Sequence, residues 1–228
     1  MQLDTYGQQT QVLSQGANRV LRNTYMLLAL TMVPTVAGAL LGVQMQFSFM
    51  AGSPFISFML FMGISFAFFY GIEKNKNSGV GVALLLAFTF FMGLMLSRIL
   101  QVALGFSNGG SMIALAAGGT GAIFATLASI ASVSKRDFTN MGKFLTVGLV
   151  VVLLAMVANI FLQMPVLHLV ISAAVVLLFS GYILYDISQI MQGGETNYVT
   201  ATLAVYLDVY NVFVSLLNLI MAFGGDRD

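Results

Sequence analysis

Residues 144–164 read FLTVGLVVVLLAMVANIFLQM and contain no Asp, Glu, Lys or Arg. An apolar run of about 20 residues is long enough to cross a hydrocarbon core of ~30 Å as a helix. A helix is required there because it satisfies every backbone polar group within the segment. This stretch therefore predicts a membrane-spanning helix.

Six further runs of the same character extend this prediction to most of the chain. The segments between them are short, which indicates one bundle rather than several domains. We therefore expect an all-α integral membrane protein with a seven-helix transmembrane domain over residues 24–223. Residues 1–23 are rich in Gln, Thr, Ser and Gly and predict a flexible tail, and residues 224–228 form a short external tail. The seven predicted spans are residues 24–43, 51–70, 80–104, 111–133, 144–164, 166–191 and 198–223.

Composition agrees with a membrane protein and excludes several functions. The 228 residues are 59% hydrophobic and 7% charged, whereas a soluble domain spends about a quarter of its residues on charge. The surface that lacks charged residues must therefore face lipid. A net charge of +1 provides no field for a nucleic acid. With no cysteine and one histidine, His168, a thiolate or histidine-rich metal site is impossible, and we expect no cofactor.

Basic residues predict the orientation, because they stay on the cytoplasmic side during insertion. The loops at 44–50 and 105–110 and the turn at Pro165 carry no Lys or Arg. We therefore expect a cytoplasmic N-terminus, an external C-terminus and a location in the bacterial inner membrane. A signal peptide is the less favoured interpretation of the first run, which is as long as a true span. Basic residues on the predicted cytoplasmic side are Arg19, Arg22, Lys74, Lys76, Lys135, Arg136 and Lys143.

Small residues recur at helix spacing in two of the runs. Such faces let two helix backbones approach closely. We expect both to pack inside one bundle, with dimerisation as the alternative. The two sets are Gly38 with Gly42, and Ala114, Gly118, Ala122 and Thr126.

Three ionisable residues lie within the predicted spans: Arg98, Asp186 and Asp208. A charge at the centre of a membrane helix costs at least ~2.5 kcal/mol on insertion scales, so each is a candidate functional residue. Arg98 lies late in its span, where a long side chain can reach the headgroups, and we favour that role. The short aspartate side chains cannot reach so far.

Asp186 and Asp208 are expected to meet. Asp186 lies near the cytoplasmic end of its span, and Asp208 lies ~15 Å from that side on the returning helix at 1.5 Å per residue. Two adjacent buried carboxyl groups do not both ionise easily, because desolvation and mutual repulsion oppose it. One shared proton makes the pair a candidate pH-sensitive latch. Deprotonated, both are candidate transient Ca²⁺ ligands; the alternative is a structural pair that fixes the helix register.

A polar stripe accompanies Asp208. Asn211, Ser215 and Asn218 follow it at steps of three and four, which places them on one helix face. Because such a stripe is costly against lipid, it should face the bundle interior or a water-filled path. Further candidates for this path are Tyr185 and Gln189 in the sixth span and Asn159 in the fifth.

Several motifs resemble one known family. GYILYD at 181–186 and VYLDVYN at 205–211 resemble the signature of the Bax inhibitor-1 (TMBIM) family. VLRNTY at 20–25, MVANIFLQ at 156–163 and GGETNY at 193–198 resemble its bacterial YccA branch. The resemblance covers nearly the whole chain and implies a seven-helix bundle with a cytoplasmic N-terminus.

The resemblance implies two functions, both non-enzymatic. The family's paired aspartates are described as a pH sensor that governs a calcium leak, and they match Asp186 and Asp208. The YccA branch implies a protein that engages the membrane AAA protease FtsH, offers it a cytoplasmic tail and restrains it. One departure affects gating: some family members latch the pair with an arginine in the second span, and residues 51–70 contain no basic residue.

These observations give two hypotheses and a remote third. The first is a slow, pH-dependent leak of Ca²⁺ or another cation, gated by the aspartates. The second is modulation of FtsH by direct contact. The third is an intramembrane aspartyl protease, because paired carboxyl groups supply an acid and a base. It is disfavoured because Asp208 follows Val205-Tyr206-Leu207 instead of Gly-x-Gly, and no Pro-Ala-Leu motif occurs.

Overall fold

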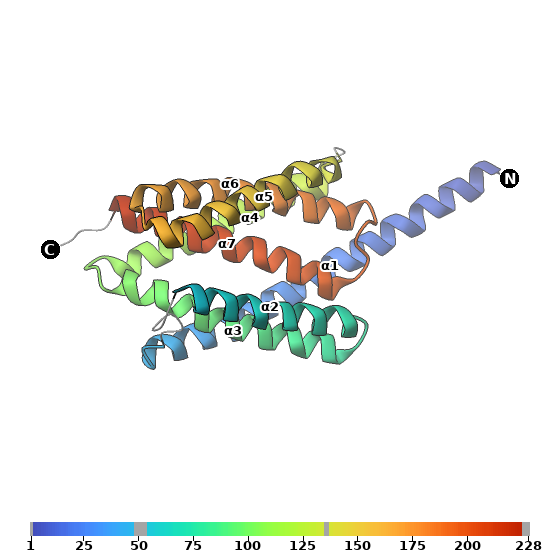
Figure 1. Cartoon of the computed structure of the whole chain (residues 1–228). Helices are drawn as coiled ribbons and strands as arrows, with labels where there is room; N and C mark the ends of the chain where they lie inside the picture. The colour runs from blue at the N-terminus through green and yellow to red at the C-terminus, as the bar shows by residue number, and fades with distance from the viewer. Residues whose placement is uncertain (1, 48–53, 135–136, 225–228) are drawn as a thin grey trace.

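The computed structural model describes residues 2–47, 54–134 and 137–224 of the chain. This part of the chain contains seven α-helices and one short 3-10 helix, and no strand. Successive helices run in opposite directions and form one bundle (Figure 1). The elements are α1 (Gln2–Gln44), α2 (Pro54–Asn75), α3 (Gly79–Leu104), α4 (Gly109–Val133), η1 (Thr139–Met141), α5 (Gly142–Leu162), α6 (Pro165–Met191) and α7 (Tyr198–Gly224).

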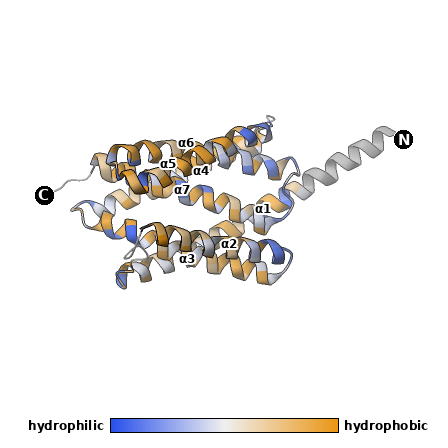
Figure 2. Cartoon of the chain, viewed as in Figure 1, coloured by the Kyte–Doolittle hydropathy of each residue, from blue (hydrophilic) through white to orange (hydrophobic). Residues whose placement is uncertain are grey.

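All seven α-helices contain a segment long and apolar enough to cross a membrane, which confirms the predicted fold class. Large apolar side chains such as Phe144, Leu154 and Leu177 are exposed on the outside of the bundle, where lipid would cover them. Figure 2 shows hydrophobic residues along the helices and hydrophilic residues gathered towards their ends. The predicted start of the second span at residues 51–53 lies outside the described residues.

The N-terminal segment belongs to a long helix. α1 is helical from Gln2 and continues without a break into its membrane span, which begins at Gly16. Its first turns lie beyond the rest of the bundle (Figure 1). The flexibility of residues 1–23 stays a prediction.

Glycines bring α1 and α3 close together, as expected. A Cβ at Gly38 would collide with the carbonyl oxygen of Phe90, and a Cβ at Gly93 would collide with that of Thr35. A Cβ at Gly42 would also lie too close to the side chain of Ser97. The small residues of α4 do not behave this way. The expectation that they pack inside the bundle is wrong, because Ala114, Gly118, Ala122 and Thr126 are all exposed.

α7 lies at the centre of the bundle and contacts α1, α2, α3, α4 and α6. Tyr206 of α7 is 1% exposed, and its hydroxyl lies 3.0 Å from the Oγ1 atom of Thr35 in α1. Its ring also packs edge-to-face against Phe88 of α3. Neighbouring helices therefore contact α7 on several sides and fix its position in the bundle.

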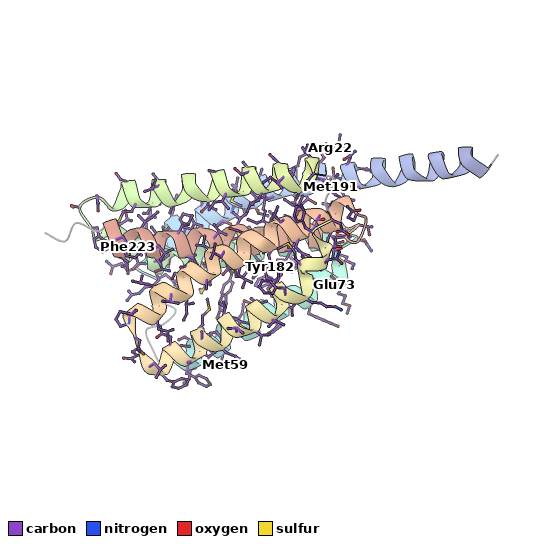
Figure 3. All side chains as sticks on the ribbon, turned by 90° about the horizontal axis from the view of Figure 1, so that it is seen from above. Arg22, Met59, Glu73, Tyr182, Met191 and Phe223 are labelled. Carbon is purple, nitrogen blue, oxygen red and sulfur yellow. The ribbon has the colours of Figure 1, made fainter. Side chains whose placement is uncertain are left out.

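The basic segments gather at one end of the bundle, called the basic end below. Figure 3 shows Arg22, Glu73 and Met191 there, and Phe223 at the opposite end. The Nδ2 atom of Asn197 donates hydrogen bonds to the carbonyl oxygen of Lys76 at 3.1 Å and to Oδ1 of Asn77 at 2.8 Å. The loops that follow α2 and α6 are thus tied together. This arrangement fits the predicted sidedness, and a cytoplasmic position of the basic end stays a prediction.

Candidate functional site between α6 and α7

A polar cavity of about 250 Å³ opens near the basic end. Its polar wall consists of Tyr185, Asp186 and Gln189 of α6 with Glu195 from the following turn. Gln189 donates a hydrogen bond from Nε2 to the Tyr185 hydroxyl at 2.7 Å, which holds both side chains. Glu195 accepts a hydrogen bond from the backbone N–H of Asn197 at 2.7 Å and lines the same cavity as Asp186.

Asp208 of α7 lies deeper than this cavity and is only 4% exposed. Its Oδ2 atom is buried and has no hydrogen-bond partner in the described part of the chain. Asp186 lines the cavity itself, and contact between the carboxyl groups of Asp186 and Asp208 stays a prediction.

A second polar cavity, of about 300 Å³, lies towards the opposite end between α5, α6 and α7. Asn159 is fixed there because its Oδ1 atom accepts a hydrogen bond from the backbone N–H of Met164 at 3.0 Å. Asn211 donates from Nδ2 to the carbonyl oxygen of Leu207 at 2.8 Å. We call this space the far cavity. Its polar lining residues are Asn159, His168, Ser172, Asn211, Ser215 and Asn218.

One face of α7 connects the two cavities. Ala201 and Ala204 line the cavity at the basic end, and Asn211, Ser215 and Asn218 line the far cavity. Asp208 lies between these two sets, and the steps along the helix alternate between three and four residues. The buried carboxyl group therefore separates two polar spaces on the same helix face.

The predicted path residues fall into two groups. Tyr185 and Gln189 line the basic-end cavity beside Asp186, whereas the four predicted asparagine and serine residues line the far cavity. The sequence did not indicate Glu195, and it gave His168 no role in a site. Glu195 precedes α7 and His168 lies in the first turn of α6. The neighbours of both residues depend on how the loops fold back on the bundle. Among the described residues no group of three or more His, Asp or Glu could hold a metal ion, so the Ca²⁺ ligands stay a prediction.

The family model for the inhibitor of apoptosis-promoting Bax1 matches residues 17–225. The chain belongs to the Bax inhibitor-1 family. An uncharacterised protein of Neisseria meningitidis serogroup A is 40% identical over 232 residues, which span 99% of this chain and 100% of that protein. An uncharacterised protein of Pseudomonas aeruginosa is 39% identical over 91% of this chain and 90% of its own length.

Relatives from Escherichia coli carry more informative names. The K12 protein is named modulator of FtsH protease YccA and is 40% identical over 205 residues, or 90% of both chains. Its counterpart in strain O6:H1 is named inner membrane protein YccA and matches to the same extent. With its seven apolar helices, this member of the Bax inhibitor-1 family is a multi-pass protein of the bacterial inner membrane.

Proposed function

We propose that this protein modulates a membrane-anchored protease of the FtsH type by direct contact, without a catalytic role of its own. The observation that carries this proposal is the 40% identity, over 90% of both chains, to the Escherichia coli protein named a modulator of FtsH protease. The position of α1 supports it, because its first turns extend past the bundle at the basic end (Figure 1). On the predicted orientation, that segment is available to a cytoplasmic partner.

The test reconstitutes this protein with Escherichia coli FtsH and measures how fast the protease degrades a membrane substrate. We expect degradation to slow as the amount of this protein increases. Removal of residues 2–15 should weaken the effect, because those turns of α1 lie outside the bundle and their loss leaves the membrane spans intact. An unchanged rate with folded, co-reconstituted protein would contradict the proposal.

A second function is favoured by a specific arrangement: the buried Asp208 lies between two polar cavities on one face of α7. We propose that cations cross slowly along this face, and that the proton shared with Asp186 closes the path. Flux should rise with pH, because loss of the shared proton leaves two carboxylates that attract a cation. The leak and the protease function are compatible in one protein.

Flux of Ca²⁺ into dye-loaded proteoliposomes between about pH 6 and 8 tests the leak. Asp186→Asn and Asp208→Asn should abolish the pH dependence. Asp137→Asn is the matched control: hydrogen bonds from the N–H and hydroxyl of Thr139 lower the pKa of Asp137, so it stays ionised throughout that range. Flux equal to that of empty liposomes, or pH dependence that survives in both site variants, would refute the leak.

A further inference from the structure

A third cavity, of about 560 Å³, lies between α2, α3 and α7 towards the end opposite the basic end. Its walls are mainly apolar and include Phe47, Phe58 and Phe61. Arg98 of α3 also lines it. We call this space the Arg98 crevice. Its size lies within the range that small-molecule sites occupy in proteins.

The charge of Arg98 distinguishes this crevice from an ordinary gap between helices. Arg98 lies within the membrane span Gly79–Leu104, and it makes no hydrogen bond or ion pair with any residue that the structure describes. The sequence places no acidic residue in the loop at 48–53. Arg98 is exposed and lies near the end of its span, where its long side chain can reach the headgroup region and an anionic partner there. The surrounding bilayer provides one in the phosphate group of a lipid.

The shape of the crevice matches the two parts of such a molecule. A guanidinium group offers several donors in a plane and binds phosphate oxygens well. Phe58 and Phe61 line the same crevice and give it an apolar wall that suits an acyl chain. Met156, Val214 and Asn218 line both the Arg98 crevice and the far cavity. An occupant of the crevice would therefore also border the far cavity.

We propose that the Arg98 crevice binds one anionic phospholipid, with its phosphate on the Arg98 guanidinium group and an acyl chain against Phe58 and Phe61. On the predicted orientation, this lipid belongs to the outer leaflet. This inference is independent of both proposed functions.

The absence of tryptophan from the chain allows a direct test. Phe58→Trp places a fluorescent reporter on the crevice wall. Leu115→Trp places a control reporter on the exposed surface of α4, which is not part of the crevice. Each protein is reconstituted in mixtures of phosphatidylglycerol and phosphatidylcholine, with brominated acyl chains on one of the two lipids. Quenching then reports which lipid lies against the tryptophan.

We expect the Phe58→Trp reporter to prefer phosphatidylglycerol by about fivefold, since one basic residue is worth about 1 kcal/mol towards an anionic lipid. The preference should disappear with Arg98→Gln and persist with Arg98→Lys, which retains the charge. The Leu115→Trp reporter should show equal quenching by both lipids in every background.

Two results would overturn the proposal. One is equal quenching of the Phe58→Trp reporter by both lipids while Arg98 is present. The other is a phosphatidylglycerol preference that survives Arg98→Gln, which would place the anion elsewhere. Gel filtration of each variant in detergent verifies the fold, and Arg98→Lys retains a charged side chain in case Arg98→Gln is unstable.

Discussion

At the scale of single residues, Asp208 is unfavourable for the stability of the fold. Its Oδ2 atom is buried without a partner in the described part of the chain, and such an atom costs about 1–3 kcal/mol. Other buried polar residues, such as Thr31 and Thr35, instead donate their hydroxyl groups to carbonyl oxygens of α1. An aspartate kept at this position supports a role in function rather than in packing.

Stability measurements distinguish a functional pair from a structural one. Asp186→Leu combined with Asp208→Leu should leave the free energy of unfolding unchanged or raise it by about 1 kcal/mol, because replacing both members removes the desolvation cost. Unfolding in mixed detergent and SDS, followed by circular dichroism, measures this. A structural pair that fixes the register of α6 on α7 would instead show a loss of at least 1 kcal/mol.

Single residues also show where sequence reasoning succeeds. Helix periodicity alone places the polar residues of α7 on one face, and Asn211, Ser215 and Asn218 line one cavity there. The division of the predicted path residues between two cavities was not predicted, and neither was the place of His168 or Glu195 on the cavity walls. Those features depend on which helices and loops lie opposite, and this information is absent from the spacing of residues.

At the scale of elements, hydropathy predicts the spans well because each helix must satisfy its own backbone within lipid. The predicted run 80–104 matches α3 (Gly79–Leu104) within one residue. Hydropathy does not predict which helices pack against each other. Small residues predicted close packing for both α1 and α4, and only α1 packs that way. Small size permits a close approach, but the arrangement of the other helices decides whether one occurs.

The α1–α3 contact gives a prediction at this scale. Gly93→Ala should lower the free energy of unfolding by about 1–3 kcal/mol, because the new methyl group meets the carbonyl oxygen of Thr35 and the two backbones must separate. Gly118→Ala in α4 is the control, since nothing lies within 4 Å of a Cβ at that position. Equal unfolding profiles for the two variants would show that α1 and α3 are less closely packed than described.

At the scale of the whole molecule, the protease proposal and the leaflet of the lipid on Arg98 depend on which end of the bundle faces the cytoplasm. The loops tied together by Asn197 bring Lys74 and Lys76 to the same end as Arg22. A protease partner would engage that end, and a lipid on Arg98 would come from the opposite leaflet. The structure shows which segments lie at the same end of the bundle. The basic residues then predict which side of the membrane that end faces.

The absence of cysteine makes this orientation directly measurable. Ser78→Cys lies at the start of α3 at the basic end, and Ser107→Cys lies between α3 and α4 at the opposite end. Both positions are exposed, so the two variants differ mainly in the end of the bundle that carries the cysteine. A membrane-impermeant maleimide should label Ser107→Cys in intact spheroplasts and Ser78→Cys only after permeabilisation. The reverse pattern would place the basic end outside, move the first turns of α1 away from any cytoplasmic protease and assign the lipid on Arg98 to the inner leaflet.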